Sequence, residues 1–529
     1  MLNRVFKFFV RNYLDYFFIF LIAFFVFFYL QSTATLPDPD SFYHAKIADL
    51  IKKQGIITSF PWAQFSTLKD NYIDHHFLYH LYLIPFTLFF KPLIAIKMAT
   101  IFLDIILVLF FYFFLTHFKI KWRFLWVLIL LTINPFLFRI SLAKAPALSI
   151  IFLLLGFYAL VNYRRWLLFF LSFFYIWAYG GWPLLWLLSF IYFAIDIIYD
   201  KFKKQSLFWQ TIKLIISPIH PLKKKKKRKD LFLALFFGTV AGLIINPYFP
   251  KNIYFYYQQV YQIAVINLQK IIGVGGEWYP YGLSSLIKDT GILFPILIIA
   301  LFIFIISFKK QSRVSIILFF VALFFFLYTL KSRRSVEYFV PFSLLFASFS
   351  VDGFLKSILV KTQINLGLWL SPSLKRLLNV FIIALLLIII WFGATDLKIV
   401  RKDMERGISL IYYQGAGNWL SQNTPKGSIV LHSDWDDFPI LFYFSDNNYY
   451  INGLDQTFMY NFDKNLFWQW INITTGKSPD NLIKVIKNDF RASYIFIESD
   501  HLAMDNLFKN NNFFKLIYQD NEAKIYQVK

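Results

Sequence analysis

The sequence LPDPDSFYHAK, from Leu36 to Lys46, follows the first long apolar run of the chain, Asp15 to Leu30. It places two carboxylates, a tyrosine and a histidine beside a hydrophobic segment. Ionisable side chains at the mouth of a hydrophobic bundle are costly to place there and usually have a function. The sequence therefore predicts a membrane-embedded active site with Asp40 at its centre.

The composition assigns the chain to the polytopic α-helical membrane proteins. Of 529 residues, 58% are hydrophobic and only 16% are charged, which is more apolar surface than a soluble protein of this length can bury. Apolar runs recur from Asp15 to Trp391, and many are long enough for the hydrocarbon core of a bilayer. The absence of cysteine excludes disulfides and thiol chemistry.

The net charge of +24 indicates membrane topology rather than nucleic-acid binding. Lys223 to Lys229 is an uninterrupted basic run between apolar segments, as expected of a cytoplasmic loop under the positive-inside rule. The same run could also contact anionic membrane lipids. Arg4, Lys7 and Arg11 place the N-terminus inside, and the first span is expected to stay as a signal anchor in the cytoplasmic membrane.

The segment Phe77 to Phe90 decides the topology. If it crossed the membrane, every later basic loop would face outside, so we interpret it as a surface or re-entrant helix within a first outer loop, 31–93. The helix from Asp40 to Lys53 is expected to lie on the membrane surface. The chain then has about eleven predicted spans whose connecting loops satisfy the positive-inside rule. The spans are 13–30, 94–117, 124–138, 146–163, 166–179, 182–199, 231–247, 290–308, 314–330, 338–354 and 377–395.

The chain divides into a transmembrane domain, 1–395, and a tail, 396–529, with a basic cytoplasmic loop at 199–230 and an outer loop at 248–289. An odd number of spans puts the tail outside, on the side of Asp40. Alternating short strands and helices predict that it is an α/β domain. The predicted strands are Ser428–His432, Asn448–Ile451, Ser493–Ile497, Phe514–Tyr518 and Ala523–Val528, and the predicted helices are Leu410–Leu420 and Ser478–Asn488.

Two clusters on the outer face allow more than one interpretation. The cations Lys331, Arg333 and Arg334 either bind a lipid phosphate or extend toward lipid headgroups. The polar run Asp74, His75 and His76, with His80 after it, either serves catalysis or packs at the interface. A zinc site is not expected there, because His76 and His80 lack a clear third ligand.

Asp38 and Asp40 also allow two roles. Carboxylates two residues apart in a loop can hold a hard cation, or one can act as a general base while the other caps the next helix. Asp38 follows Pro37 and is expected to be the turn or cap residue, which leaves Asp40 for chemistry.

The motif DSFYHAK, with Asp40 before Tyr43 and His44, resembles the first outer loop of archaeal and bacterial oligosaccharyltransferase catalytic subunits. That family belongs to the GT-C superfamily of membrane glycosyltransferases, which use polyprenyl-linked sugar donors. Three further matches are the turn WAYGGW at 177–182, Glu277 in a long outer loop, and Trp435-Asp436 in the tail. The loop around Glu277 is expected to be a mobile lid, because it contains Gly273, Gly275 and Gly276.

The resemblance implies an inverting transfer of a sugar or oligosaccharide from a polyprenyl phosphate or pyrophosphate. Asp40 would be the general base, and the lipid phosphate would lie near Arg333 and Arg334. The family's second outer loop carries an acidic pair that helps to hold Mg²⁺ or Mn²⁺, whereas this chain has RISLAKAP at 139–146. The role of the cation would then fall to Lys144 or Arg139.

Two other functions remain open from the sequence. A flippase or transporter of a lipid-linked glycan would also carry intramembrane charges, although the chain has no inverted repeat. A catalytically inactive GT-C-like scaffold would explain the missing acidic pair. The sequence specifies neither the oligomeric state nor the sugar, the acceptor or the polyprenol.

Overall fold

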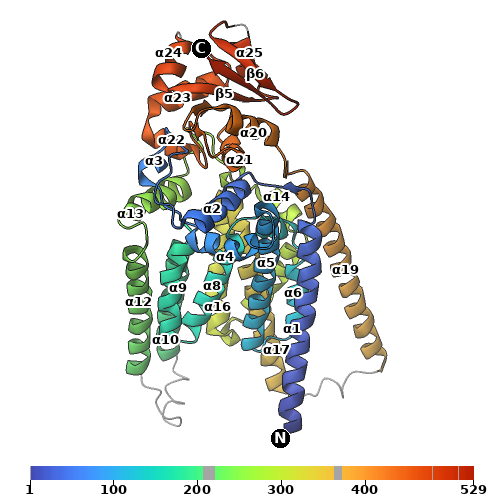
Figure 1. Cartoon of the computed structure of the whole chain (residues 1–529). Helices are drawn as coiled ribbons and strands as arrows, with labels where there is room; N and C mark the ends of the chain where they lie inside the picture. The colour runs from blue at the N-terminus through green and yellow to red at the C-terminus, as the bar shows by residue number, and fades with distance from the viewer. Residues whose placement is uncertain (1, 206–220, 363–371, 479–480, 510) are drawn as a thin grey trace.

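The computed structural model describes residues 2–205, 221–362, 372–478, 481–509 and 511–529. Long, roughly parallel helices form a bundle, and the tail covers one end of it, away from the N-terminus (Figure 1). The helices of the bundle are α1 (Leu2–Gln31), α5 (Pro92–His117), α6 (Arg123–Leu130), α7 (Asn134–Ile140), α8 (Pro146–Val161), α9 (Arg165–Ala178), α10 (Pro183–Gln205), α12 (Pro221–Ile244), α14 (Leu283–Asp289), α15 (Leu293–Ile306), α16 (Arg313–Lys331), α17 (Val336–Thr362) and α19 (Pro372–Glu405).

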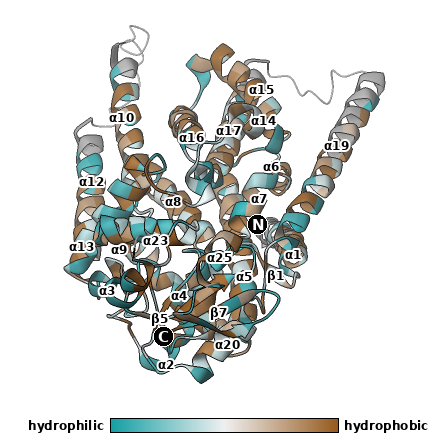
Figure 2. Cartoon of the chain, turned by 90° about the horizontal axis from the view of Figure 1, so that it is seen from above, coloured by the Kyte–Doolittle hydropathy of each residue, from teal (hydrophilic) through white to brown (hydrophobic). Residues whose placement is uncertain are grey.

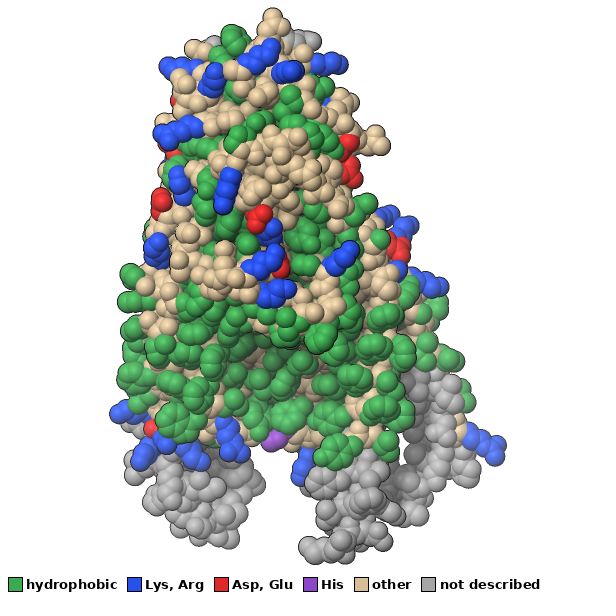
Figure 3. Space-filling view, viewed as in Figure 1, with side chains coloured by type: hydrophobic (Ala, Val, Ile, Leu, Met, Phe, Trp, Pro, Cys, Tyr) green, Lys and Arg blue, Asp and Glu red, His purple; other side chains and the backbone are tan. Residues whose placement is uncertain are grey.

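The bundle has a hydrophobic belt suited to a membrane. Five of its described helices are long and apolar enough to cross a bilayer, or seven if each of two bent pairs is counted as one span. Apolar residues cover the middle of the molecule in Figure 3, with basic residues at the lower edge of the belt. Seen from above, α12 and α19 stand at opposite edges of the bundle (Figure 2). The total of eleven spans stays a prediction.

Two of the predicted spans are bent. The span predicted at 124–138 consists of α6 and α7, which meet at 75°, and Pro135 at the start of α7 explains the break because it cannot donate the helical hydrogen bond. The span predicted at 290–308 starts later, at α15, and α14 meets it at 100°. Gly291 lies in this bend with a φ of +52°, a conformation that glycine adopts without strain.

Two short helices lie between the bundle and the tail. Helix α4 (Phe77–Thr87) has 11 residues, too few to cross a bilayer, and packs on α2, α5 and α9. Helix α2 (Asp40–Gln54) does not lie open on a membrane surface as predicted. Most of its residues are buried against α4, α5 and α21 of the tail, and Lys46 forms an ion pair with Asp446 at 3.1 Å.

Smaller elements complete the outer side of the bundle. They are α3 (Leu68–Asn71), α13 (Lys251–Tyr256), the π-helix η1 (Tyr257–Ile266), and the 3₁₀ turns η2 (Gly276–Trp278), η3 (Phe308–Lys310) and η4 (Arg333–Ser335). Strand β1 (Thr35–Leu36) pairs with β2 (Ile408–Ser409), and the hydroxyl of Thr35 donates to the carbonyl of Met404 at 2.6 Å. These contacts fix the segment before Asp40 to the end of α19.

The tail contains a five-stranded sheet in the order β4-β3-β5-β7-β6. Strand β3 runs parallel to β4 and β5, whereas β7 runs antiparallel to β5 and β6. The five strands lie at the predicted segments: β3 (Ile429–Leu431), β4 (Tyr449–Tyr450), β5 (Ala492–Glu498), β6 (Phe514–Gln519) and β7 (Ala523–Val528). The helices of the tail are α20 (Gln414–Asn423), α21 (Asp437–Phe444), α22 (Gln456–Phe462), α23 (Lys464–Thr474), α24 (Leu482–Lys484), the π-helix η5 (Val485–Asp489) and α25 (Leu502–Lys509).

One predicted helix of the tail begins later than expected. Helix α20 starts at Gln414, four residues after the predicted start at Leu410. The helix predicted from Ser478 includes residues 479–480, which lie outside the described part. Beyond them, α24 continues as η5.

Candidate active site

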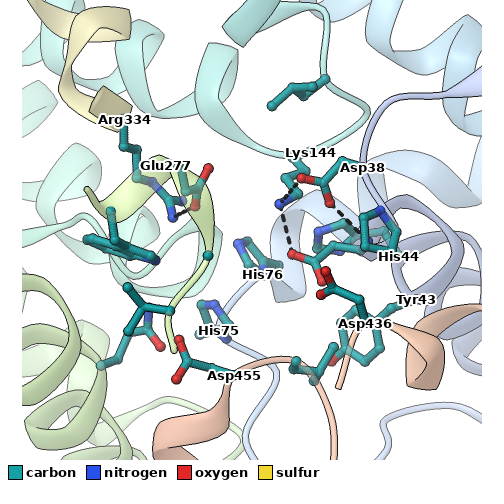
Figure 4. Close-up of a pocket in the computed structure, with 18 of the residues that line it drawn as sticks. Asp38, Tyr43, His44, His75, His76, Lys144, Glu277, Arg334, Asp436 and Asp455 are labelled. Carbon is teal, nitrogen blue, oxygen red and sulfur yellow. Dashed lines mark hydrogen bonds and ion pairs between the residues drawn. The ribbon is translucent and has the colours of Figure 1, made fainter. Parts of the chain in front are cut away.

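A polar cavity of about 490 Å³ lies where the bundle meets the tail (Figure 4). Its walls include the start of α2 and the loop before it, the segment before α4, the loops around α7 and η2, the turn η4, and two loops of the tail. Of the predicted site residues, it brings together Asp38, Asp40, Tyr43, His44, His76, Arg139, Lys144, Glu277, Arg334, Trp435 and Asp436. Segments far apart in the sequence thus converge around Asp40.

Lys144 bridges the two aspartates of the first loop. Its Nζ lies 2.7 Å from Asp38 Oδ2 and 2.8 Å from Asp40 Oδ2, and the lysine side chain is 11% exposed. The other oxygen of Asp38 accepts from the backbone N–H of Asp40 at 2.9 Å, as the predicted turn role requires. Asp40 is the first residue of α2, and its side chain is 29% exposed within the cavity.

The surroundings of Asp40 raise its pKa toward neutral pH. Burial raises the pKa of Asp40 to about 6, with Asp38 adding to the rise and the Lys144 ammonium opposing it. Burial works against the charge of Lys144 as well, but Asp38 and Asp40 outweigh it and raise the pKa of Lys144 above its usual value. The lysine therefore stays charged between the two acids.

Glu277 is held by two arginines on the other side of the cavity. Its carboxylate accepts from Arg139 Nη1 at 2.5 Å and from Arg334 Nη1 at 2.5 Å. Burial raises the pKa of Glu277, but the two guanidinium groups outweigh burial and hold it well below the usual value. Arg139 also donates to Glu337 at 2.9 Å and 3.1 Å. Glu277 is thus a fixed anion here, and its role as a mobile lid residue stays a prediction.

Arg334 lies where the polar cavity adjoins a second hollow, the apolar groove, of about 360 Å³. The guanidinium lies 5.0 Å from the Trp278 ring centroid and donates to the hydroxyl of Tyr179. Apolar residues of α10, α16 and η1 line much of the groove, among them Leu184, Leu187, Val260, Ala264 and Phe324. One end of this groove therefore carries a positive charge.

Arg333 has a different position from the one predicted. It is exposed, lines neither the polar cavity nor the apolar groove, and donates from Nε to the carbonyl of Pro280 at 3.2 Å. Since η4 is a tight turn, adjacent side chains point in different directions, and Arg334 is the one that points inward. Of the predicted arginine pair, only Arg334 lies in position to meet a ligand in these two hollows.

A chain of buried histidines connects the cavity to Asp74. His44 Nδ1 lies 2.8 Å from His80 Nε2, and His80 Nδ1 lies 2.7 Å from Asp74 Oδ2. His80 thus joins the ring of His44 to the carboxylate of Asp74 in one hydrogen-bonded chain. Burial lowers the pKa of His44 well below its usual value, so His44 is neutral.

The tail contributes acids to the cavity. Asp436 lines it beside Trp435, and burial together with neighbouring carboxylates raises the pKa of Asp436 to about 8. Asp455, which was not predicted as a site residue, also lines the cavity. Nothing in the local sequence marks Asp455, because it reaches the site only through the docking of the tail onto the bundle.

Several other lining residues were missed from the sequence. Tyr179 belongs to the recognised WAYGGW turn, and its contact with Arg334 gives that turn a role in the site. Gln259 and Trp278 line both the cavity and the groove, as does His75 of the polar run noted in the sequence. The adjacency of Trp278 to Glu277 was the one available signal, whereas Gln259 lies in a π-helix that no pattern predicted.

Comparison with known proteins identifies the fold. Neither protein-family models nor curated protein sequences match the chain. Among solved structures, the oligosaccharyltransferase AglB from Archaeoglobus fulgidus, in complex with an inhibitory peptide and a dolichol-phosphate, is similar with a TM-score of 0.64 and 13% identity, over 92% of this chain and 70% of that one.

Two other solved structures are similar over nearly the whole chain. ArnT from Cupriavidus metallidurans, bound to undecaprenyl phosphate, has a TM-score of 0.52 and 13% identity, over 96% of this chain and 97% of that one. The arabinofuranosyltransferase AftD from Mycobacteria has a TM-score of 0.56 and 9% identity, over 97% of this chain and 40% of that one. These structures confirm the resemblance seen in the sequence, and the chain has the fold of the GT-C membrane glycosyltransferases.

Proposed function

We propose that the chain is a membrane glycosyltransferase that moves a sugar or oligosaccharide from a polyprenyl phosphate or pyrophosphate to an acceptor. One observation carries the proposal: Arg334 lies at the junction of the apolar groove and the polar cavity. A lipid-linked sugar has the same three parts in the same order, namely an apolar chain, an anionic phosphate and a polar sugar. The two solved relatives bound to polyprenyl phosphates support this assignment.

The placement of the charged groups suits a single displacement. Figure 4 shows Asp40's neighbours Asp38 and Lys144 on one side of the cavity, Arg334 with Glu277 on the other, and His75 and His76 between them. Asp40 would take the proton of the acceptor as its oxygen or nitrogen attacks the anomeric carbon. The bond from that carbon to the phosphate oxygen breaks, and the phosphate leaves with the electron pair toward Arg334. Attack and departure on opposite sides invert the configuration.

Binding of the lipid tests the proposal directly. The purified chain should bind undecaprenyl phosphate but not undecaprenol, as measured by native mass spectrometry, because the alcohol lacks the anion that Arg334 contacts. When offered lipid-linked sugars, the chain should then release the phosphate lipid. Equal binding of the two lipids would contradict the assignment. Movement of the lipid-linked sugar across vesicles without sugar transfer would favour a flippase instead.

The orientation in the membrane is also part of the proposal. The basic run Lys223–Lys229 forms the first turns of α12, at the end of the bundle opposite the tail, so the positive-inside rule places the active site and the tail outside. We expect a periplasmic-type reporter, such as alkaline phosphatase, to be active when fused after Lys529. A fusion active only with a cytoplasmic reporter such as green fluorescent protein would reverse the topology.

A further inference from the structure

The position between Asp38 and Asp40 is one that a bound cation would be expected to fill. Two carboxylate oxygens converge there, one from Asp38 in the turn before α2 and one from Asp40 at its start, and a third acid, Asp436, lines the same cavity. Hard divalent cations select this kind of oxygen-rich site. In this chain the convergence point is filled by Lys144 Nζ, at 2.7 Å and 2.8 Å from the two oxygens.

The other acids of the cavity do not supply an alternative metal site. Both oxygens of Glu277 are engaged by Arg139 and Arg334. In the part of the chain that the structure describes, three ligand atoms come within 4.8 Å of one another only at Glu498, Asp500 and His501 in the tail. The residues of the cavity therefore do not fit a divalent cation, despite the metal that the oligosaccharyltransferase resemblance implies.

We infer that the ammonium of Lys144 takes the place of a divalent cation between Asp38 and Asp40, so that this site works with a cation built into the chain. An ammonium is a compact charge with three donors, and two of them satisfy these carboxylates. The Lys144 ammonium offsets the repulsion between the carboxylates of Asp38 and Asp40. It also orients Asp40 toward the cavity without a metal cofactor.

Of the two cations considered from the sequence, the structure selects Lys144. Arg139 forms its close ion pairs with Glu277 and Glu337, on the other side of the cavity. The loop between α7 and α8 carries Lys144, which lines the cavity. The contribution of Lys144 to sugar transfer rests on the proposed function, whereas its occupation of the cation position does not.

Binding of Mn²⁺ tests the inference without any substrate. Electron paramagnetic resonance counts free and bound Mn²⁺ in the purified chain, and every sample carries His501→Ala to weaken the cluster in the tail. We expect no Mn²⁺ bound in the cavity of this parent. Lys144→Gln removes the charge but keeps much of the length, and should bind one Mn²⁺ at least tenfold more tightly than the parent. Adding Asp40→Asn to Lys144→Gln should abolish that site.

Lys46→Gln is the matched control. Lys46 is also a largely buried lysine in an ion pair, with Asp446 at 3.1 Å, but it contacts a single carboxylate and does not line the cavity. This variant should gain no Mn²⁺. One Mn²⁺ bound by the parent and lost in Asp40→Asn would overturn the inference, as would a Lys144→Gln variant that folds but binds no Mn²⁺.

Sugar transfer from a lipid-linked donor gives a second readout, and it separates this inference from the proposed function. Transfer by the parent should be unchanged by a metal chelator, whereas transfer by Lys144→Gln should fall and be partly restored by Mn²⁺. If the chain binds no polyprenyl phosphate at all, the proposed function fails while the Mn²⁺ result still decides the role of Lys144.

Discussion

Replacing Asp40 with asparagine is expected to lower sugar transfer by ~10²–10⁴-fold, the usual contribution of a general base. The substitution keeps the size of the side chain and removes the group that accepts the proton. Because Arg334 and the apolar groove stay intact, binding of undecaprenyl phosphate should be unchanged. Transfer and lipid binding should therefore be measured on the same purified preparation.

The pH profile identifies the base more specifically. A base must be deprotonated to act, and the pKa of Asp40 is raised to about 6. Transfer should consequently rise with pH up to about 6 and level off above it, with a slope of about tenfold per pH unit on the acid side. The residual activity of Asp40→Asn should lose this step. A step that persists unchanged in the variant would assign the titration to another group.

Asp49→Asn serves as the control for Asp40→Asn. Asp49 lies on the same helix, α2, but it forms ion pairs with Lys52 and Lys53 and does not line the cavity. Its replacement should leave transfer close to the parent value. If Asp40 only supported the start of α2, asparagine would replace it without loss, because asparagine caps helices as well as aspartate does. Transfer by Asp40→Asn at the parent rate would therefore exclude Asp40 as the base.

The features of the site that follow from local sequence could be predicted. Asp40 stands after a proline turn at the start of a helix, and a turn residue, Asp38, precedes it, so their positions follow from neighbouring residues alone. Hydropathy and the distribution of basic loops predicted a helical membrane bundle with a helix, α4, that does not cross it. The strands of the tail were predicted from their apolar alternation.

The features that depend on tertiary contacts could not be predicted. The apolar side of α2 was expected to lie on the membrane, because apolar spacing alone does not say which partner covers it. One partner is α21, from a distant part of the chain. The pairing of His44 with His80 and Asp74 joins two helices. Nor does the sequence reveal which of two adjacent arginines points inward, since that depends on the 3₁₀ turn between α16 and α17.

These adjacent arginines provide the second large effect. Arg334→Ala should weaken the binding of undecaprenyl phosphate by about 10–150-fold, which corresponds to the ~1.5–3 kcal/mol of a lost charge-assisted contact. The affinity of Arg334→Lys for the lipid should lie between those of Arg334→Ala and the parent, because lysine keeps the charge but loses the planar pair of donors. Titration with the lipid, followed by native mass spectrometry, gives the three affinities.

Arg333→Ala is the matched control, with the same side chain removed one residue away. Arg333 is exposed and contacts the Pro280 carbonyl and the Tyr281 ring, so its loss should change lipid affinity by less than about twofold, as for surface substitutions in general. Arg334 also holds Glu277, and the melting temperature of each variant must therefore be compared with that of the parent. Since Arg139 still pairs with Glu277 in Arg334→Ala, the fold around the cavity should persist. If Arg333→Ala weakened binding more than Arg334→Ala did, the phosphate would lie on the outer side of η4, and the apolar groove would not be the path of the lipid.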